Sequence, residues 1–446
     1  MSRFNTGSST GRSDMKANLA GGLGFVMDPK EELAGLILTS WAADKFYQSF
    51  TQECARLDKL IVDCGPDFAL KCAVYARRVH GLRSISHVVA AKVSKLQDLK
   101  PFFPWRKYYD LVIQRPDDIT EILALLDCKI THAMKKAFAG QMEGFSEYQL
   151  AKYAKFERAQ KVSLNDAVRV LNTKRTDALE KLVYRTLKNT DTWEARGNTK
   201  QTWIDLIEEG KLGYLALLRN LRNMEQHFLS DLAARALTDP EAVKKSRVFP
   251  FQFLNAYRNV NSPTLKEAIV TACDLSMGNI PDVPGKTVIL LDTSGSMAQN
   301  HMNETGALFA CAFPRAQIVL FDTRAQGAPP LKGMSGALNM PFRGGGTDFQ
   351  CAYRFLRDNQ IKADRLVMIS DMQHWVGGDS SYGTYLEWKD LTGSDPELWS
   401  IDLAGYGTTQ FPAGRARQLF GFSEKIFEVM SDMEGGLVDR IEHGVS

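Results

Sequence analysis

The chain has 446 residues, of which 44% are hydrophobic and 24% are charged, and these are the proportions of a water-soluble globular protein. Its length is sufficient for two or three domains with cores of their own. No segment has the apolar length that a membrane span requires, so we expect a cytoplasmic protein that makes no membrane contact.

The net charge of +3 conceals an uneven distribution of charge along the chain. Residues 285–446 hold 14 Lys and Arg against 19 Asp and Glu, whereas residues 1–284 hold 41 against 33. A polyanionic partner such as nucleic acid is therefore expected on the first part of the chain. An ordinary solvated surface has a similar charge, so composition leaves both interpretations open.

Residues 1–17 are polar, with Ser, Gly and Arg and no apolar core. This composition predicts a disordered tail and not a signal peptide. The seven cysteines are odd in number and show no CxxC pairing, so we expect neither a disulfide framework nor structural zinc.

The chain from residue 28 to about residue 273 reads almost entirely as helices of ordinary length, separated by short breaks. Successive helical hairpins without a long central apolar helix predict a superhelical stack of the kind that HEAT repeats form. Amphipathic examples are residues 31–38, 68–79, 118–126, 177–187 and 213–223.

Cations cluster in the middle of this helical region, with Tyr153 and Phe156 among them. Clustered cations neutralise phosphates, and aromatic rings stack on unpaired bases, so we predict contact with RNA. For any single residue the alternative is a solvated outer face of the stack. The predicted RNA-binding residues are Lys135, Lys136, Lys152, Lys155, Arg158, Lys161, Arg169 and Lys174.

A second basic group lies earlier in the helical region. It comprises Arg77, Arg78, His80, Arg83 and His87, on one predicted helix and the loop that follows. We consider it as a second candidate path for RNA.

Residues 285–446 read differently, as alternating apolar strands and helices. Strands are predicted at residues 287–291, 316–321, 365–370 and 397–403. Helices are predicted near residues 301–313, 349–358 and 423–434. This alternation predicts a doubly wound α/β domain.

A cation site is predicted at the end of the first of these strands. The sequence Asp-Thr-Ser-Gly-Ser begins at Asp292, and a strand that turns sharply into a helix can converge side chains i, i+2 and i+4 on one point. Thr347, after three glycines, and Asp371, at the end of another strand, supply two further oxygens. Carboxylates and hydroxyls suit Mg²⁺ or Mn²⁺ and not zinc. The predicted metal ligands are Asp292, Ser294, Ser296, Thr347 and Asp371.

This series of ligands resembles the metal-ion-dependent adhesion site of von Willebrand factor A domains, in which DxSxS is followed by a Thr and then an Asp. All five positions match. In such domains the open coordination position takes water or the acidic side chain of a protein ligand.

The helical region resembles the TROVE module of the Ro ribonucleoprotein family, and a TROVE module followed by an A domain is that family's architecture. The chain is similar to a bacterial or phage-type member. The resemblance is carried by residues 130–138 (ITHAMKKAF), 150–153 (LAKY), 162–172 (VSLNDAVRVLN) and 216–221 (ALLRNL). It implies a polar tail at 1–17, a TROVE module at 18–275 and an A domain at 285–446.

The resemblance also implies a ring of helical repeats that the A domain closes. In this family the basic outer surface binds small structured RNAs called Y RNAs, and the central hole accepts single-stranded 3′ ends of misfolded or noncoding RNAs. A role in RNA quality control or processing follows, with an exoribonuclease as a protein partner and the chain itself a monomer. Lys135, Lys136 and Arg169 match the helices that contact RNA in the family.

We do not expect an enzyme, because the phosphate-binding and hydrolytic patterns GxxxxGK[ST], HExxH and GxSxG are missing. Asp322 and Asp348 are near the predicted metal ligands, but as surface or supporting groups. The alternative function is metal-dependent protein binding by the A domain, with the helical region as a scaffold without RNA function.

Overall fold

The chain folds into two compact units, each assembled from separate stretches of sequence. The sheet unit comprises Met1–Ser49, Val243–Arg258 and Ile269–Phe427, and the helical unit comprises Phe50–Ala242, Asn259–Ala268 and Glu428–Ser446. The modules predicted at 18–275 and 285–446 are continuous stretches of sequence, whereas these units are not. The module boundaries therefore stay a prediction. The computed structural model describes residues 15–17, 23–25, 28–39, 50–154, 161–188, 196–248, 250–280, 285–313, 315–330, 332–372, 381–404, 416–420, 427, 429–430 and 436–445.

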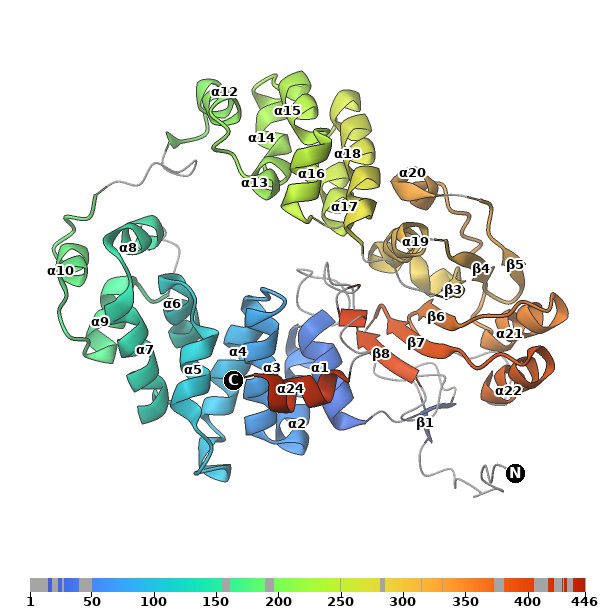
Figure 1. Ribbon diagram of the computed structural model, residues 1–446, viewed down its shortest axis with the longest axis horizontal. Helices are drawn as coiled ribbons and strands as arrows, with labels where there is room; N and C mark the ends of the chain where they lie inside the picture. The colour runs from blue at the N-terminus through green and yellow to red at the C-terminus, as the bar shows by residue number, and fades with distance from the viewer. Residues whose placement is uncertain are drawn as a thin grey trace. The chain divides into compact units, whose positions relative to one another are not determined.

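The helical unit is a stack in which each helix packs against the helix two places further along the chain (Figure 1). Contacts join α3 to α5, α4 to α6, α5 to α7, α6 to α8, α7 to α9 and α8 to α10. This pattern is that of a helical-repeat stack, as predicted. The helices are α2 (Phe50–Cys64), α3 (Pro66–Arg78), α4 (Ser84–Ser94), α5 (Trp105–Val112), α6 (Pro116–Leu125), α7 (His132–Gly144), α8 (Glu147–Ala154), α9 (Leu164–Leu171) and α10 (Asp177–Val183).

Local sequence sets where several of these helices begin. The Thr131 hydroxyl accepts a hydrogen bond from the backbone of Met134 at the start of α7. Ser163 and Asp166 form a reciprocal capping box at the start of α9. The core between α5 and α7 includes Tyr109 and Phe138, which are fully buried with ring centroids 6.3 Å apart. Caps and buried aromatic rings therefore fix the middle of the stack.

Further along the chain, one predicted helix is divided into two. Residues 213–223 form α13 and α14, which meet at Asn220. The Asn220 side chain donates to the Ala216 carbonyl, in competition with the helical backbone, which explains the break. The helices of this part of the chain are α12 (Lys200–Glu208), α13 (Tyr214–Arg219), α14 (Leu221–Gln226), α15 (Ser230–Leu237), α16 (Pro240–Ser246), α17 (Pro250–Arg258) and α18 (Pro263–Ser276). Of these, α17 belongs to the sheet unit, and α16 and α18 are divided between the two units.

One helix from the far end of the chain completes the helical unit. This helix is α24 (Leu437–Gly444), which packs against α3. Ile441 is fully buried, and Lys71 on α3 donates from Nζ to the Glu442 carbonyl oxygen over 2.7 Å. Among the described residues, we find no helix with the length and apolar character to cross a membrane.

The sheet unit is built on a six-stranded sheet in the order β5-β4-β3-β6-β7-β8, with only β5 antiparallel to its neighbour. The four strands predicted from sequence are β3, β4, β6 and β7. The strands are β3 (Thr287–Asp292), β4 (Gln317–Phe321), β5 (Ala325–Gly327), β6 (Arg365–Ser370), β7 (Glu397–Asp402) and β8 (Ala416–Phe420).

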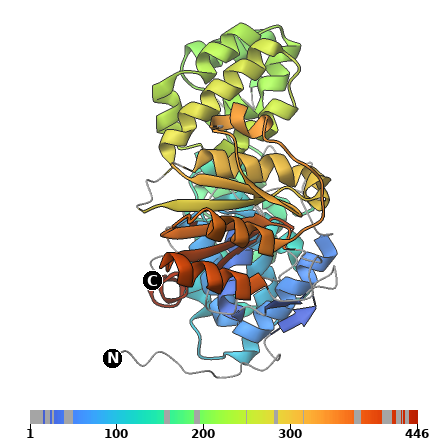
Figure 2. The same ribbon diagram turned by 90° about the vertical axis from the view of Figure 1, so that its right-hand side faces the viewer.

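Helices cover both faces of this sheet, as Figure 2 shows. On one face lies α19 (Met302–Ala312), where a Cβ on Gly306 would come within 3.1 Å of the Leu291 side chain. The opposite face packs against α21 (Phe349–Asp358) and α22 (Ser381–Thr392) through side chains such as Leu290. The predicted α plus α/β architecture with a doubly wound sheet is therefore confirmed. The short helix α20 (Gly333–Leu338) contacts α19.

The beginning of the chain departs from the predicted disordered tail. Residues Met15–Ala17 form β1, which pairs antiparallel with β2 (Leu23–Phe25), so the prediction is wrong for these three residues. Pairing between the strands satisfies the hydrogen-bonding groups of the backbone, and composition does not predict this pairing because every residue has these groups. Further along, α1 (Pro29–Thr39) packs against β8.

Candidate functional site

The predicted metal ligands gather at the point where the chain reverses its direction of travel across the sheet. From β3 the chain moves to β4 on one side, and it later returns to β6 on the other side. Asp292 ends β3, and Asp371 directly follows β6, which lies beside β3 in parallel register. Ligands of open α/β sheets bind at this kind of switch point, beyond the carboxyl ends of the strands.

Asp292 is fully buried and is held by hydrogen bonds from uncharged groups. One carboxylate oxygen accepts from the backbone of Ser294 over 2.8 Å, and the other accepts from the Ser370 hydroxyl over 2.5 Å. The hydroxyl oxygens of Ser294 and Ser296 are 3.2 Å apart. These contacts hold the two serine hydroxyls and the Asp292 carboxylate within one turn, and their role as metal ligands stays a prediction. Ser370 is an additional partner of Asp292, and only its place at the end of a predicted strand pointed to it.

The glycine loop that carries Thr347 is hydrogen bonded to the DxSxS loop. The Gly344 amide donates to the Thr293 carbonyl over 3.0 Å, and the Gly295 amide donates to the Gly345 carbonyl over 2.9 Å. A Cβ on Gly295 would lie 3.1 Å from the Gly344 carbonyl oxygen, so this close approach is what requires glycine. Thr347 is 2% exposed on this loop.

The electrostatics of this edge favour a bound cation. Burial, and after it the negative charge of Asp371, raise the pKa of Asp292 to about 7. Within the part of the chain that the structure describes, Asp292 forms no ion pair with Lys, Arg or His. Two buried carboxylates and nearby hydroxyls form a donor set that fits a hard divalent cation, which would offset their repulsion.

Asp322 and Asp348 have structural partners beside this site. The Asp322 carboxylate accepts from the Arg324 backbone over 2.9 Å and pairs with Arg343 at 3.5 Å. Asp348 caps α21 by accepting from the Gln350 backbone. Both carboxylates therefore support loops.

The predicted RNA-binding residues lie on α7, α8, α9 and the segments that join them. Lys136, Lys161, Arg169 and Lys174 are exposed, and Lys135 and Lys152 are half-buried. Among described residues, none of these six forms an ion pair with a carboxylate. Lys155, Arg158 and the aromatic Phe156 lie outside the described residues.

One contact joins two of these segments, and two others place cations beside Tyr153. The Lys174 backbone donates to the Glu143 carboxylate over 2.7 Å, which joins the segment after α9 to the end of α7. The Arg115 guanidinium lies 5.1 Å from the Tyr153 ring centroid, and Lys152 Nζ lies 5.7 Å from it. Tyr153 is therefore already in contact with cations. We use the term basic surface for Lys135, Lys136, Lys152, Lys161, Arg169 and Lys174.

The second basic group has a structural role. Arg77 pairs with the fully buried Asp118 over 2.7 Å, and Arg83 pairs with Asp117, Asp118 and Glu121. His87 lies 2.8 Å from the Glu121 carboxylate. The carboxylates of α6 neutralise Arg77 and Arg83, whereas Arg78 is exposed and donates from Nε to the Leu111 carbonyl.

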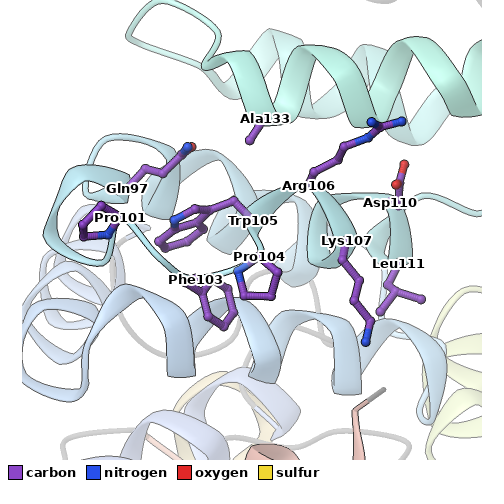
Figure 3. Close-up of a pocket in the computed structure, with 10 residues that line it drawn as sticks. All are labelled: Gln97, Pro101, Phe103, Pro104, Trp105, Arg106, Lys107, Asp110, Leu111 and Ala133. Atoms are coloured by element: carbon purple, nitrogen blue, oxygen red, sulfur yellow. The ribbon is translucent and has the colours of Figure 1, made fainter.

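Sequence reasoning missed an open pocket of about 760 Å³ in the helical unit (Figure 3). It lies between the loop after α4, helix α5 and helix α7. The sequence feature that could have indicated this pocket is the run from Pro101 to Tyr109, PFFPWRKYY, which combines aromatic residues, two prolines and two basic residues. The lining residues are Gln97, Pro101, Phe103, Pro104, Trp105, Arg106, Lys107, Asp110, Leu111 and Ala133.

Comparison with known proteins gives consistent results. The model of the TROVE domain matches residues 184–272, which include the ALLRNL segment at 216–221. Telomerase protein component 1 of Mus musculus is 25% identical over 327 residues, covering 51% of this chain and 12% of the relative. The protein of the same name from Rattus norvegicus is 25% identical over 318 residues, covering 49% and 12%. The chain thus spans about an eighth of the length of these relatives.

The fold is shared with a solved structure. The crystal structure of the Deinococcus radiodurans Ro protein superposes with a TM-score of 0.66 at 16% sequence identity. The match covers 94% of this chain and 100% of that one. Residues 184–272 are thus similar to the TROVE domain, and the chain shares the fold of a Ro protein over nearly its whole length.

Proposed function

We propose that this protein binds RNA, with the basic surface as its principal contact. The observation that carries the proposal is the set of cations on α7, α9 and their connections that have no carboxylate partner among the described residues. Cations without internal partners gain most from neutralising phosphates, because binding releases the counterions of the RNA.

The finer proposal is that small structured, Y-like RNAs bind the basic surface and that single-stranded 3′ ends of noncoding or misfolded RNAs bind the same protein. The similarity of residues 184–272 to the TROVE domain supports this assignment. The protein then acts in RNA quality control or processing, with an exoribonuclease as a partner and no catalysis of its own.

The test is binding of a hairpin RNA with a free 3′ tail, measured by fluorescence anisotropy over a range of salt concentrations. Lys135→Glu/Lys136→Glu should weaken binding about 10-fold or more and reduce the slope of log K against log salt by about 2. The matched control is Lys244→Glu/Lys245→Glu, an adjacent exposed pair on α16 with the same change of charge.

The controls decide the interpretation. Equal weakening by both pairs means general electrostatic attraction, and unchanged affinity in Lys135→Glu/Lys136→Glu contradicts the assignment of the basic surface. A blunt hairpin without the tail measures the contribution of the 3′ end. Absence of any RNA affinity in the unchanged protein contradicts the proposed function itself.

The buried carboxylates at the end of β3 favour a second function, divalent-cation binding that presents a coordination position to an acidic protein ligand. Asp292, Ser294, Ser296, Thr347 and Asp371 would hold Mg²⁺ or Mn²⁺. If this site and the basic surface are independent, Asp292→Ala leaves RNA affinity within about 2-fold of the unchanged protein in the same assay. A larger loss means that the metal site supports the RNA-binding conformation.

A further inference from the structure

The pocket beside α5 has a rigid aromatic floor. Trp105 is 4% exposed, and its ring nitrogen donates to the Lys100 carbonyl over 3.0 Å. The Phe103 ring stacks on Tyr108 at 4.7 Å between centroids and meets Trp105 edge-on at 4.7 Å. These contacts hold the Phe103 and Trp105 rings in place. A flat ligand can therefore bind without the entropic cost of ordering the two side chains.

The backbone around this floor is also constrained. The Phe103 amide donates to the Lys100 carbonyl over 3.1 Å, and prolines at 101 and 104 flank Phe103. A proline has a fixed φ, which restricts the conformations of the loop. Gln97, on the short helix η2 (Gln97–Leu99), lines the side of the pocket and offers an amide to a polar ligand edge.

Cations stand at the rim of the pocket. Arg106 and Lys107 are exposed on the first turn of α5, and Figure 3 shows Arg106 directed toward α7. Over the described ranges, neither side chain forms an ion pair within 4.0 Å. Asp110 is also at the rim and offsets one of the two charges. The rim keeps a net positive charge, which suits a ligand that combines an apolar ring with an anionic group.

The pocket adjoins the basic surface. Ala133 on α7 lines the pocket, and Lys136 lies three residues further on, on the same face of the helix. A chain of nucleotides that contacts Lys136 can therefore reach the pocket within one helical turn, about 5.4 Å.

We propose that this pocket holds an unpaired base of bound RNA, with the base against Phe103 and Trp105 and the neighbouring phosphates at Arg106 and Lys107. The inference rests on the proposed RNA-binding function and adds a specific site for single-stranded sequence. Aromatic floors beside cations are the usual means of binding unpaired nucleotides, because every base has an apolar face and every nucleotide a phosphate.

Two variants test the pocket in different ways. Ala133→Trp fills the pocket without changing charge, and Arg106→Gln/Lys107→Gln removes the rim cations from exposed positions. Their controls are Ala139→Trp, at a half-buried position elsewhere on α7, and Lys244→Gln/Lys245→Gln. Thermal unfolding of each variant checks that the fold is kept.

The probe is an unstructured single-stranded RNA containing 4-thiouridine. Affinity is measured by anisotropy, and photochemical crosslinks are mapped by mass spectrometry of peptides. Each pocket variant should weaken binding about 5-fold to 100-fold and lose the crosslink to residues 97–111, whereas the controls should keep both.

The failure of this inference is distinguishable from failure of the proposed function. If RNA binding depends on Lys135 and Lys136 but neither pocket variant weakens it, and crosslinks fall elsewhere, the pocket inference alone is overturned. The remaining candidate ligand of the pocket would then be an apolar segment of a protein. If the unchanged protein binds no RNA, both proposals are overturned together.

Discussion

Asp292 is a fully buried carboxyl group with a strongly raised pKa. Its pKa rises from 3.8 to about 7, first because burial disfavours the charged form and then because Asp371 is close. In the unfolded chain the carboxyl loses its proton near its ordinary pKa. The folded state therefore binds more protons between about pH 4 and 7, and over that window the metal-free protein loses stability as pH rises, by about 4 kcal/mol in all.

A divalent cation should reverse this trend, because it binds the deprotonated carboxylate. We expect Mg²⁺ to raise the melting temperature more at about pH 8 than at about pH 6, as measured by thermal unfolding with and without the ion. Asp292→Asn should abolish both the pH trend and the response to Mg²⁺. An equal response to Mg²⁺ in Asp292→Asn would show that the ion binds elsewhere.

Sequence predicted single residues well where local spacing determines the geometry. Asp292, Ser294 and Ser296 follow one strand, so their convergence depends on a few backbone angles. By contrast, the pairing of Arg77 with Asp118 joins residues 41 positions apart. The local sequence did not distinguish the paired Arg77 from Lys136, which has no ion pair among the described residues. Pairing depends on which helices pack together.

Helix α6 links α3 and α4, because carboxylates in its first turn pair with Arg77 on α3 and with Arg83 at the start of α4. Asp118 is fully buried, and it accepts hydrogen bonds from Arg77, Arg83 and the backbone of Gln114 and Arg115. Burial alone would raise the pKa of Asp118, but its interactions with His87, and after them those with Arg77, hold that pKa well below its usual range. One carboxylate thus connects three helices of the stack.

Removal of this carboxylate should be costly. Asp118→Ala leaves Arg77 buried without its partner, and we expect the free energy of unfolding to fall by about 3–5 kcal/mol in urea denaturation followed by circular dichroism. The control is Asp127→Ala, which breaks the exposed pair with Lys95 and should cost less than about 1 kcal/mol. Similar losses in the two variants would contradict a structural role for the network around α6.

Elements with a continuous apolar run or a clear helical spacing of apolar residues were predicted closely, and those without either were missed. The run before Asp292 became β3, and residues 349–358 became α21 with the predicted bounds. The edge strands β5 and β8 and the helix α22 were not predicted, because short or polar segments carry little periodic signal and take their structure from their neighbours. The predicted helix at 423–434 lies mostly outside the described residues.

At the scale of the whole molecule, α24 shows that the helical unit depends on residues far along the chain. Leu437 and Ile441 are buried in this unit, although they follow the sheet in sequence. Ile441→Ala should cost about 2–5 kcal/mol in the helical unit and speed amide hydrogen exchange in α3, as measured by mass spectrometry. Val170→Ala, at a position that is 46% exposed, should change exchange little. Unchanged exchange in α3 for both variants would contradict the role of α24.

The two units also constrain the order in which the newly made chain can fold. Helix α1 packs against β8, whose residues are 416–420, and α3 packs against α24, whose residues are 437–444. Early segments of both units thus wait for partners that the ribosome produces several hundred residues later. At about 5–20 residues per second the apolar sides of α1 and α3 remain uncovered for tens of seconds during synthesis. Chaperones that cover these sides during translation should therefore raise the yield when this chain is overproduced.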